Sequence, residues 1–428
     1  MARTRPDTIG LAATLLVIAA VTLVPDAVHG RPEIDLCIVC GSIGGATAML
    51  NVLLFVPFGF FARLRWGAAW RAVGAAFLLS FCIEAVQLFV PGRETGLSDL
   101  LANTLGAALG AALALRPASW LLPDARPSRI VALVATALTA GLMIAAGPLL
   151  DPSAPPGDYY GQWKPRGFAH PTHRGEVLSA TLGGLPVPAQ KLDDPASVRA
   201  GFLNGAVLQL RYRASTPTEV IVPVFRVVYG PYGEGEDLLW IGAVDSTLVV
   251  WTRRRADDMH LARPSLVLPG ALTGVRASDT VNVSIRRFRG DGYGVTIGDR
   301  EERRIGLTVG RSWNLIYDLP LRSPVLLALV DHLWFLGLAA LIGWYAIGWR
   351  ADAIALVILA AASIGTPWIS DLVATPGTLI AALVAGLAMG SRLRWAAARG
   401  FSAWTASRPP DGGRQGTATT RPRWRRSH

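Results

Sequence analysis

Six polar residues stand in or beside apolar stretches in the first quarter of the chain, where a helix inside lipid would normally carry none. They are Asn51, Glu84, Gln87, Arg93, Asp99 and Asn103. An ionisable side chain at the centre of a bilayer costs about 3 kcal/mol on insertion scales, and a polar partner inside a helix bundle usually offsets that cost. The placement therefore predicts one coupled polar site.

The spacing of these residues puts them at one depth. Glu84 and Gln87 are three residues apart and share a helix face. Asp99 and Asn103 are four residues apart and do likewise. If Ser98 is the N-cap of the later helix, all four lie within about two helical turns of the same membrane surface. We therefore predict a site in the outer leaflet.

Three kinds of chemistry fit this set. In a structural role, Arg93 pairs with Glu84, Asp99 caps a helix, and the amides tie helices together. In a binding role, the residues form a pocket for the phosphate, sugar or amine of a membrane lipid or lipid-linked molecule. In a catalytic role, Glu84 and Asp99 exchange protons with such a substrate, as in an enzyme or transporter. Because the sequence shows no recognisable nucleophile, metal-ligand set or cofactor loop, we predict no cofactor and no metal, and we favour the non-enzymatic binding role.

The composition indicates which elements position these residues. The chain has 428 residues, of which 51% are hydrophobic, and its mean hydropathy is +0.38, which is too apolar for an ordinary soluble protein. Stretches long enough to span a bilayer lie near 8–24, 47–62, 72–90, 98–115, 130–148, 325–348, 352–369 and 374–390. We therefore predict an α-helical polytopic membrane protein with about eight spans.

The net charge of +11 follows the predicted topology and does not indicate a nucleic-acid partner. If the N-terminus is cytoplasmic, the short cytoplasmic segments hold eighteen arginines, whereas the short outer loops hold only Arg31 and Arg93. This is the positive-inside distribution of a multi-pass protein. It predicts the cytoplasmic membrane as the location, with both termini in the cytoplasm.

Residues 150–323 differ from both flanks. Runs rich in β-branched and aromatic residues are separated by Gly, Pro and Asp clusters, as in an antiparallel sandwich. They lie at 206–213, 219–228, 238–242, 247–252 and 280–286, and a hairpin is predicted from Gly290. We predict an inserted all-β sandwich or jelly-roll domain outside the membrane.

The chain therefore divides into four predicted parts. These are a five-span bundle at 1–149, an extracytoplasmic β domain at 150–323, about three further spans at 324–391, and a basic, disordered cytoplasmic tail at 392–428. In the first outer loop, Cys37 and Cys40 form a CxxC motif, which fits a structural disulfide, a redox pair or two buried thiols. The sequence leaves the redox state of this pair open.

Several ordered motifs resemble the VanZ-like membrane family over about residues 10–147. They are Asn51 with Leu54-Phe-Val-Pro57-Phe-Gly59, Glu84-x-x-Gln87, Pro91-x-Arg93, and Ser98-Asp-Leu-Leu-Ala-Asn103-Thr-x-Gly106. The resemblance implies a cell-envelope role, since members are associated with resistance to teicoplanin-type glycopeptides or lipoglycopeptides. A typical member ends after four or five spans, so the β domain and the later spans depart from the pattern.

The strand order over about residues 160–320 resembles concanavalin-like or laminin-G-like domains. Such folds often bind glycans or proteins, and four aromatic residues are candidates for stacking on sugar rings, with core packing as the alternative. They are Tyr229, Tyr232, Trp240 and Trp251. We expect a glycan or protein partner for this domain, a lipid or lipid-linked partner for the bundle, and no nucleic acid.

Overall fold

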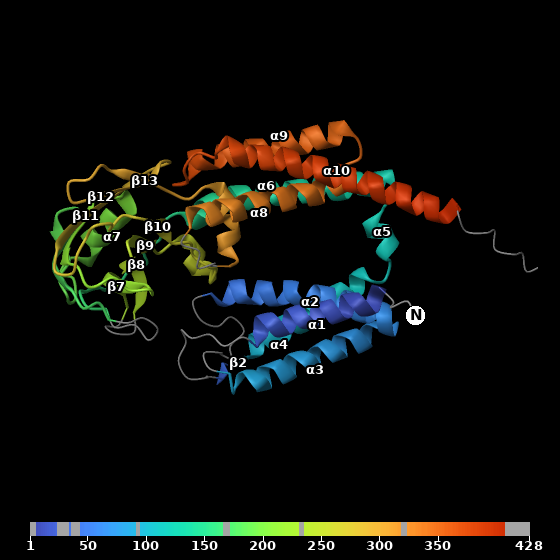
Figure 1. Ribbon diagram of the computed structural model, residues 1–428, viewed down its shortest axis with the longest axis horizontal. Helices are drawn as coiled ribbons and strands as arrows, with labels where there is room; N and C mark the ends of the chain where they lie inside the picture. The colour runs from blue at the N-terminus through green and yellow to red at the C-terminus, as the bar shows by residue number, and fades with distance from the viewer. Residues whose placement is uncertain are drawn as a thin grey trace, which may run out of the picture.

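The computed structural model describes residues 6–23, 34–35, 43–90, 95–165, 172–230, 235–317 and 323–406. Two groups of helices and one β domain make up this part of the chain (Figure 1). Six helices in the described ranges are long and apolar enough to cross a membrane, and two further apolar helices have 17 residues each. A helical membrane region with a β domain is therefore confirmed. The eight helices coincide in position with the eight predicted spans, whose number stays a prediction.

The first group of helices lies between the N-terminus and residue 113. It contains α1 (Pro6–Thr22), α2 (Gly44–Trp66), α3 (Ala69–Gln87) and α4 (Leu97–Leu113). The short strands β1 (Ile34–Asp35) and β2 (Thr95–Gly96) pair in parallel beside it. The short helix α5 (Pro117–Leu121) then leads to the second group (Figure 1).

The second group contains one helix from before the β domain and three from after it. These are α6 (Ala125–Leu150), α8 (Pro324–Tyr345), α9 (Trp349–Gly365), which continues into η3 (Thr366–Ile369), and α10 (Gly377–Ala406). The division into a five-span bundle at 1–149 and later spans stays a prediction, and in the structure α6 packs against α8 and α9. Helix α10 also continues to Ala406, past the predicted start of a disordered tail at 392.

Glycines bring α2 and α4 into backbone contact. A Cβ atom on Gly106 would lie 2.2 Å from the carbonyl oxygen of Val52, and one on Gly110 would lie 1.9 Å from that of Val56. The contacts advance together along both helices, so the helices are parallel. Small residues four apart commonly allow such close approach between membrane helices. Glycine is therefore required at these two positions.

Helices α8 and α10 repeat this contact. A Cβ atom on Gly386 would lie 2.4 Å from the Leu336 carbonyl oxygen, and one on Gly390 would lie 2.0 Å from the Ala340 carbonyl oxygen. Leu336 and Ala340 of α8 are each 284 residues after the matching Val52 and Val56 of α2. The two α10 glycines are each 280 residues after the matching glycines of α4. The two helix pairs therefore pack in the same register.

A third glycine contact follows the same offsets. A Cβ atom on Gly59 of α2 would lie 2.0 Å from the carbonyl oxygen of Ala107. A Cβ atom on Gly343 of α8 would lie 2.2 Å from the carbonyl oxygen of Leu387. In each group, the paired helices are separated in sequence by one returning helix. The second group is therefore a structural repeat of the first, with the β domain inserted between its first and second helices.

The β domain contains two antiparallel sheets. One has the strand order β10 (Leu266–Leu268), β9 (Thr247–Thr252), β8 (Glu236–Val244), β7 (Val222–Tyr229) and β3 (Tyr159–Gln162). The other has the order β13 (Arg303–Ile305), β12 (Gly292–Ile297), β11 (Thr280–Phe288), β6 (Leu208–Arg213), β4 (Glu176–Leu182) and β5 (Leu185–Pro186). Helix α7 (Pro195–Asn204) and the 3-10 helices η1 (Arg255–Met259) and η2 (Val309–Leu315) complete the domain.

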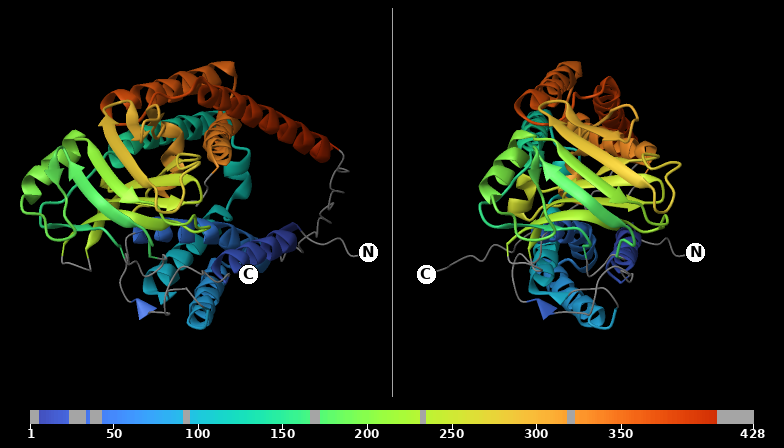
Figure 2. Two further views of the ribbon diagram at one scale, coloured as in Figure 1. Left: turned by 60° about the vertical axis from the view of Figure 1, so that its left-hand side comes forward. Right: turned by 90° about the vertical axis from the view of Figure 1, so that its left-hand side faces the viewer.

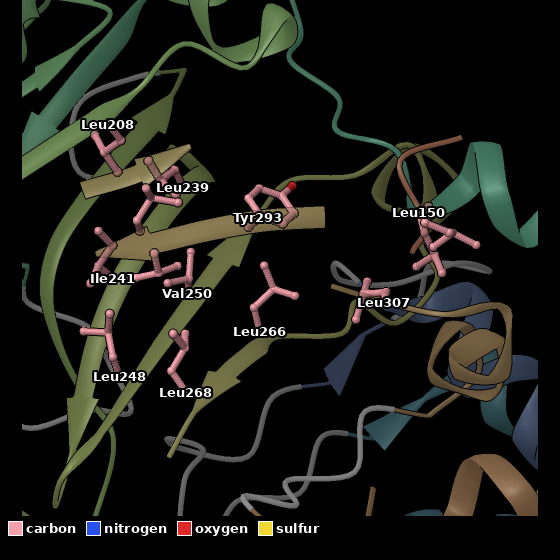
Figure 3. Packing of buried hydrophobic residues seen from close by; sticks show 14 of the residues in the cluster. Leu150, Leu208, Leu239, Ile241, Leu248, Val250, Leu266, Leu268, Tyr293 and Leu307 are labelled. Atoms are coloured by element: carbon pink, nitrogen blue, oxygen red, sulfur yellow. The ribbon is translucent and has the colours of Figure 1, made fainter. Parts of the chain in front are cut away.

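Buried side chains of both sheets share one hydrophobic cluster. In β6, Leu208, Leu210 and Tyr212 are buried while the residues between them are exposed, as strand alternation requires. Figure 3 shows such side chains from both sheets, together with Leu150 at the end of α6. The cluster therefore continues from the sheets into the second helix group. The sandwich and jelly-roll assignment stays a prediction.

Ion pairs attach the β domain to the second group, whose ends lie beside it (Figure 2). Asp331 of α8 is 7% exposed, and its Oδ1 lies 3.0 Å from Arg311 Nε and accepts a 2.7 Å hydrogen bond from Trp313 Nε1. Arg287 of β11 pairs with Asp371, which follows η3. With the first group, the domain forms a backbone hydrogen bond in which Ala46 N donates to the His260 carbonyl. The domain is therefore mainly anchored to the second group.

Candidate functional site

Glu84 lies in the last turn of α3 and is 6% exposed. Its Oε2 accepts a 3.0 Å hydrogen bond from the Gly96 N–H, and the Thr95 hydroxyl donates to its backbone carbonyl at 3.2 Å. The carboxylate therefore holds strand β2 against the end of α3. This contact positions the start of α4, which follows at once.

Asp99 lies in the first turn of α4, close enough to Glu84 for the two carboxylates to repel one another. The Ser98 hydroxyl donates to Asp99 Oδ1 at 3.3 Å. The prediction that Ser98 caps α4 is wrong, because the N-cap is Gly96 and no side chain caps this helix.

Gln87 and Asn103 connect helices. The Nε2 of Gln87 donates to the Thr22 carbonyl at the end of α1 at 2.9 Å, and the Nδ2 of Asn103 donates to the Ser80 hydroxyl of α3 at 2.9 Å. Both residues are buried, at 6% and 2% exposure. Their side-chain oxygens are also buried, without a hydrogen-bond partner among the described residues. The two amides therefore tie helices together and leave two acceptors unused.

The structure brings four of the six predicted residues to one end of the first helix group. Glu84, Gln87, Asp99 and Asn103 lie where α3 ends and α4 begins, at the end of the bundle that faces the β domain (Figure 1). Asn51 is half-buried on α2, beside the Val52 carbonyl that contacts α4. Arg93, Cys37 and Cys40 lie outside the described residues. The role of the cluster as a site stays a prediction.

The chemistry of this cluster is that of an acceptor site. Glu84 and the two unused amide oxygens are buried and Asp99 is half-buried, and all four groups accept hydrogen bonds when the carboxylates are ionised. Buried acceptors cost free energy unless a donor reaches them. A ligand that fits would supply donors, as sugar hydroxyls or an ammonium group do. Proton transfer at Glu84 with Asp99 is the second chemistry that this geometry allows.

A second candidate site lies in the β domain and was missed by sequence reasoning. It is a pocket of about 330 Å³, whose polar lining includes His173, Tyr212, Ser215, Thr218, Asp245 and Thr273. Strand β9 starts at this pocket and runs toward Arg254, which bridges to Pro152 just after α6. At about 3.3 Å per strand residue, the pocket is about 20 Å from the helix ends.

His173 connects two segments of the pocket lining through hydrogen bonds. Its Nε2 lies 3.2 Å from the Arg213 carbonyl, which can only accept, so Nε2 carries the proton and Nδ1 accepts from the Ser215 hydroxyl at 3.2 Å. Gly175 allows this approach, because a Cβ there would lie 2.4 Å from Nε2. Burial lowers the pKa of His173, so the ring is neutral at pH 7. The Tyr212 hydroxyl beside it is buried without a partner among the described residues.

The aromatic residues proposed for sugar stacking have other contacts. Trp251 is 4% exposed, and the Arg263 guanidinium lies 4.5 Å from its ring centroid. Tyr229 is half-buried, and the Arg253 guanidinium lies 4.8 Å from the centroid of its ring. Trp240 is half-buried, and Tyr232 lies outside the described residues. Packing, the alternative reading, therefore accounts for Trp251.

The comparison with known families bears on the first site. Residues 12–121 match the VanZ/LLP1 family model. This VanZ-like segment covers most of α1, all of α2 to α4 and α5, and includes Asn51, Glu84, Gln87, Arg93, Asp99 and Asn103. It ends before α6, short of the predicted extent to residue 147, and α6 indeed packs with the second group. The sequence resemblance is thereby confirmed. No curated protein and no solved structure matches the chain.

Proposed function

We propose that this chain is a non-enzymatic integral protein of the cell envelope whose VanZ-like segment binds the polar headgroup of a membrane lipid or lipid-linked molecule. The observation that carries the proposal is the buried cluster at the end of α3 and the start of α4, with unused acceptors on Gln87 and Asn103. Because the cluster offers acceptors, the headgroup presents sugar hydroxyls or an amine. A role in glycopeptide resistance would use the same site.

The topology belongs to this proposal. We place the β domain and the polar cluster on the outer side of the cytoplasmic membrane, with eight spans and both termini inside, because of the arginine distribution. A reporter active only outside the membrane should be active when fused near Pro155 and silent after Arg350. The opposite pattern would overturn the topology.

The β domain would recognise a glycan or protein partner at the pocket beside His173. The pocket is lined by hydroxyl groups, and the Tyr212 hydroxyl has no partner among the described residues. Such a lining suits a small, hydroxyl-rich ligand such as one sugar unit of a surface glycan. A concanavalin-like sandwich would present this pocket at its end remote from the membrane.

Mass spectrometry of lipids that co-purify with the full-length protein tests the binding role. The wild type should enrich one lipid class with sugar or amine headgroups over the composition of the membrane. Gln87→Leu should remove the enrichment, whereas Ser363→Ala, at a buried serine of α9 in the second group, should keep it. Equal lipid profiles for all three proteins would contradict the proposal.

The catalytic alternative is favoured by the proximity of Glu84 and Asp99. Glu84→Gln keeps the shape of the side chain and removes its proton chemistry. If this variant folds, binds lipid normally and loses its cellular function, then the site is an enzyme or transporter site. If it keeps its function, binding alone is sufficient.

A further inference from the structure

A groove lies between α6 and α9 at the membrane face opposite the β domain. It has a volume of about 510 Å³ and is formed by the first turns of α6, the connection between α8 and α9, and the first turns of α9. Helix α6 enters the β domain at its other end, at Leu150, so the groove is a full helix length away from that domain. Neither the VanZ-like segment nor the β domain contributes to its lining.

The mouth of the groove is positively charged. Arg129 of α6 and Arg350 of α9 line it, and neither forms an ion pair with any residue that the structure describes. No lining residue is acidic. The nearest carboxylate on α9, that of Asp352, faces α10 instead, where the Ser391 hydroxyl donates to it at 2.9 Å. The two guanidinium charges are therefore available to an anion.

The walls of the groove are apolar and open to lipid. Leu133 is 60% exposed and Ile354 is 58% exposed, each about one turn below an arginine. The lining continues to Thr136 and Ile358, so the groove runs for about 10 Å along the helices. Trp349 at the mouth is 75% exposed, as is usual for tryptophan at the headgroup level. An acyl chain below a charged headgroup fits this shape.

We infer that this groove binds an anionic phospholipid, with the phosphate at Arg129 and Arg350 and an acyl chain along Leu133 and Ile354. Arginine binds phosphate through paired N–H donors, and basic pockets between membrane helices bind anionic headgroups. The headgroup lies at the face opposite the proposed sugar or amine site. The inference therefore does not depend on the function proposed for the VanZ-like segment.

The test uses delipidated full-length protein in nanodiscs of phosphatidylcholine with increasing phosphatidylglycerol. Phosphatidylglycerol should raise the thermal unfolding temperature of the wild type, and native mass spectrometry should show one retained phosphatidylglycerol. Arg129→Gln and Arg350→Gln should each weaken this binding about fivefold, because one basic residue contributes about that factor near the surface. Arg126→Gln, an exposed arginine one turn away outside the groove, is the matched control and should bind as the wild type does.

Two further measurements separate the lipid from other anions. Leu133→Trp narrows the apolar wall without touching either arginine, and it should weaken phosphatidylglycerol binding. Soluble glycerol phosphate should not raise the unfolding temperature, because it lacks acyl chains. If Arg126→Gln weakens binding as much as Arg129→Gln, if Leu133→Trp has no effect, or if glycerol phosphate stabilises as well as the lipid does, then the inference is overturned.

Discussion

In both helix groups, three glycines let two parallel helices touch along their backbones, in the same register. The side chains around these contacts differ. Where α4 carries Asn103, the matching position of α10 carries Leu383, and where α2 carries Asn51, α8 carries Phe335. Leu383 and Phe335 are fully buried. The repeat therefore shows that the helix packing needs the glycines but does not need the amides, which supports a specific role for the amides in the VanZ-like segment.

The groups also differ in their relation to the β domain. The second group holds it through Asp331 and Asp371 and through a continuous hydrophobic cluster. The first group contacts it through the start of α2, where Ala46 N donates to the His260 carbonyl at 3.1 Å. One copy of the repeat thus supports the β domain, while the other carries the polar cluster at the corresponding end.

The largest effect is expected from the shared glycines. Gly106→Val and Gly386→Val each place side-chain atoms on a backbone carbonyl of the partner helix, and each should destabilise the protein by about 3 kcal/mol, the upper end for overpacking. Thermal unfolding of detergent-purified protein measures this. The controls are Gly141→Val and Gly337→Val, whose Cβ atoms would meet no atom within 4 Å. A harmless Gly386→Val would break the comparison, because the second pair would then not pack as the first does.

The next effect concerns the anchoring of the β domain. Arg287→Ala leaves the carboxylate of Asp371, which is 11% exposed, without its cation and should cost about 3 kcal/mol in chemical denaturation. Arg304→Ala on β13 removes two exposed ion pairs, to Asp291 and Glu302, whose side chains are 67% and 38% exposed, and should cost about 1 kcal/mol or less. Equal losses for the two variants would mean that the contact with the second group does not stabilise the domain.

A smaller effect on stability, with a large effect on binding, is expected for Asn103→Leu. This change gives α4 the residue that α10 already carries, so the packing should hold. The lost bond to Ser80 should cost about 1 kcal/mol or less. Binding of the headgroup should disappear in lipid co-purification, whereas Thr104→Val, one residue along, should keep it. Retained binding in a folded Asn103→Leu variant would show that the amide does not contact the ligand.

The smallest expected effect is a pH dependence in the β domain. The pKa of His173 is lowered in the folded state, so the unfolded chain binds the proton more tightly. Stability should therefore fall as the pH decreases through the unfolded value of about 6.5, by at most about 1.4 kcal/mol per pH unit. Unfolding temperatures at pH 7.5 and 5.5 should differ less in His173→Gln than in the wild type. An unchanged difference would show that His173 titrates normally.

Much of the architecture is predictable from the sequence, because length and apolarity mark spans and alternation marks strands. The run at 247–252 has the same bounds as β9. The pairing of α6 with the later helices is not predictable in this way, because apolar composition does not specify a partner. The repeat is also hard to find in the sequence. Its two copies share little more than the spacing of the contact glycines, and the β domain interrupts the second copy.

The two candidate sites also differ in how far the sequence predicts them. Glu84, Gln87, Asp99 and Asn103 could be found because polar residues are rare in apolar stretches. The pocket beside His173 could not, because its lining comes from four separated segments of ordinary polar composition. The ion pair of Arg287 and Asp371 joins residues 84 positions apart, one in the β domain and the other after η3 in the second helix group. Only folding brings these groups together.

The central claim is that the polar end of the first helix group binds a headgroup that the second group does not. Phe89, which is 86% exposed just after α3, and Trp368, which is 83% exposed after α9, mark corresponding ends of the two groups. A photo-crosslinking phenylalanine analogue at each position, followed by mass spectrometry of the lipid adducts, compares them directly. We predict one enriched lipid class at position 89, the bulk membrane composition at position 368, and loss of the enrichment on adding Asn103→Leu. The bulk composition at both positions would contradict the claim.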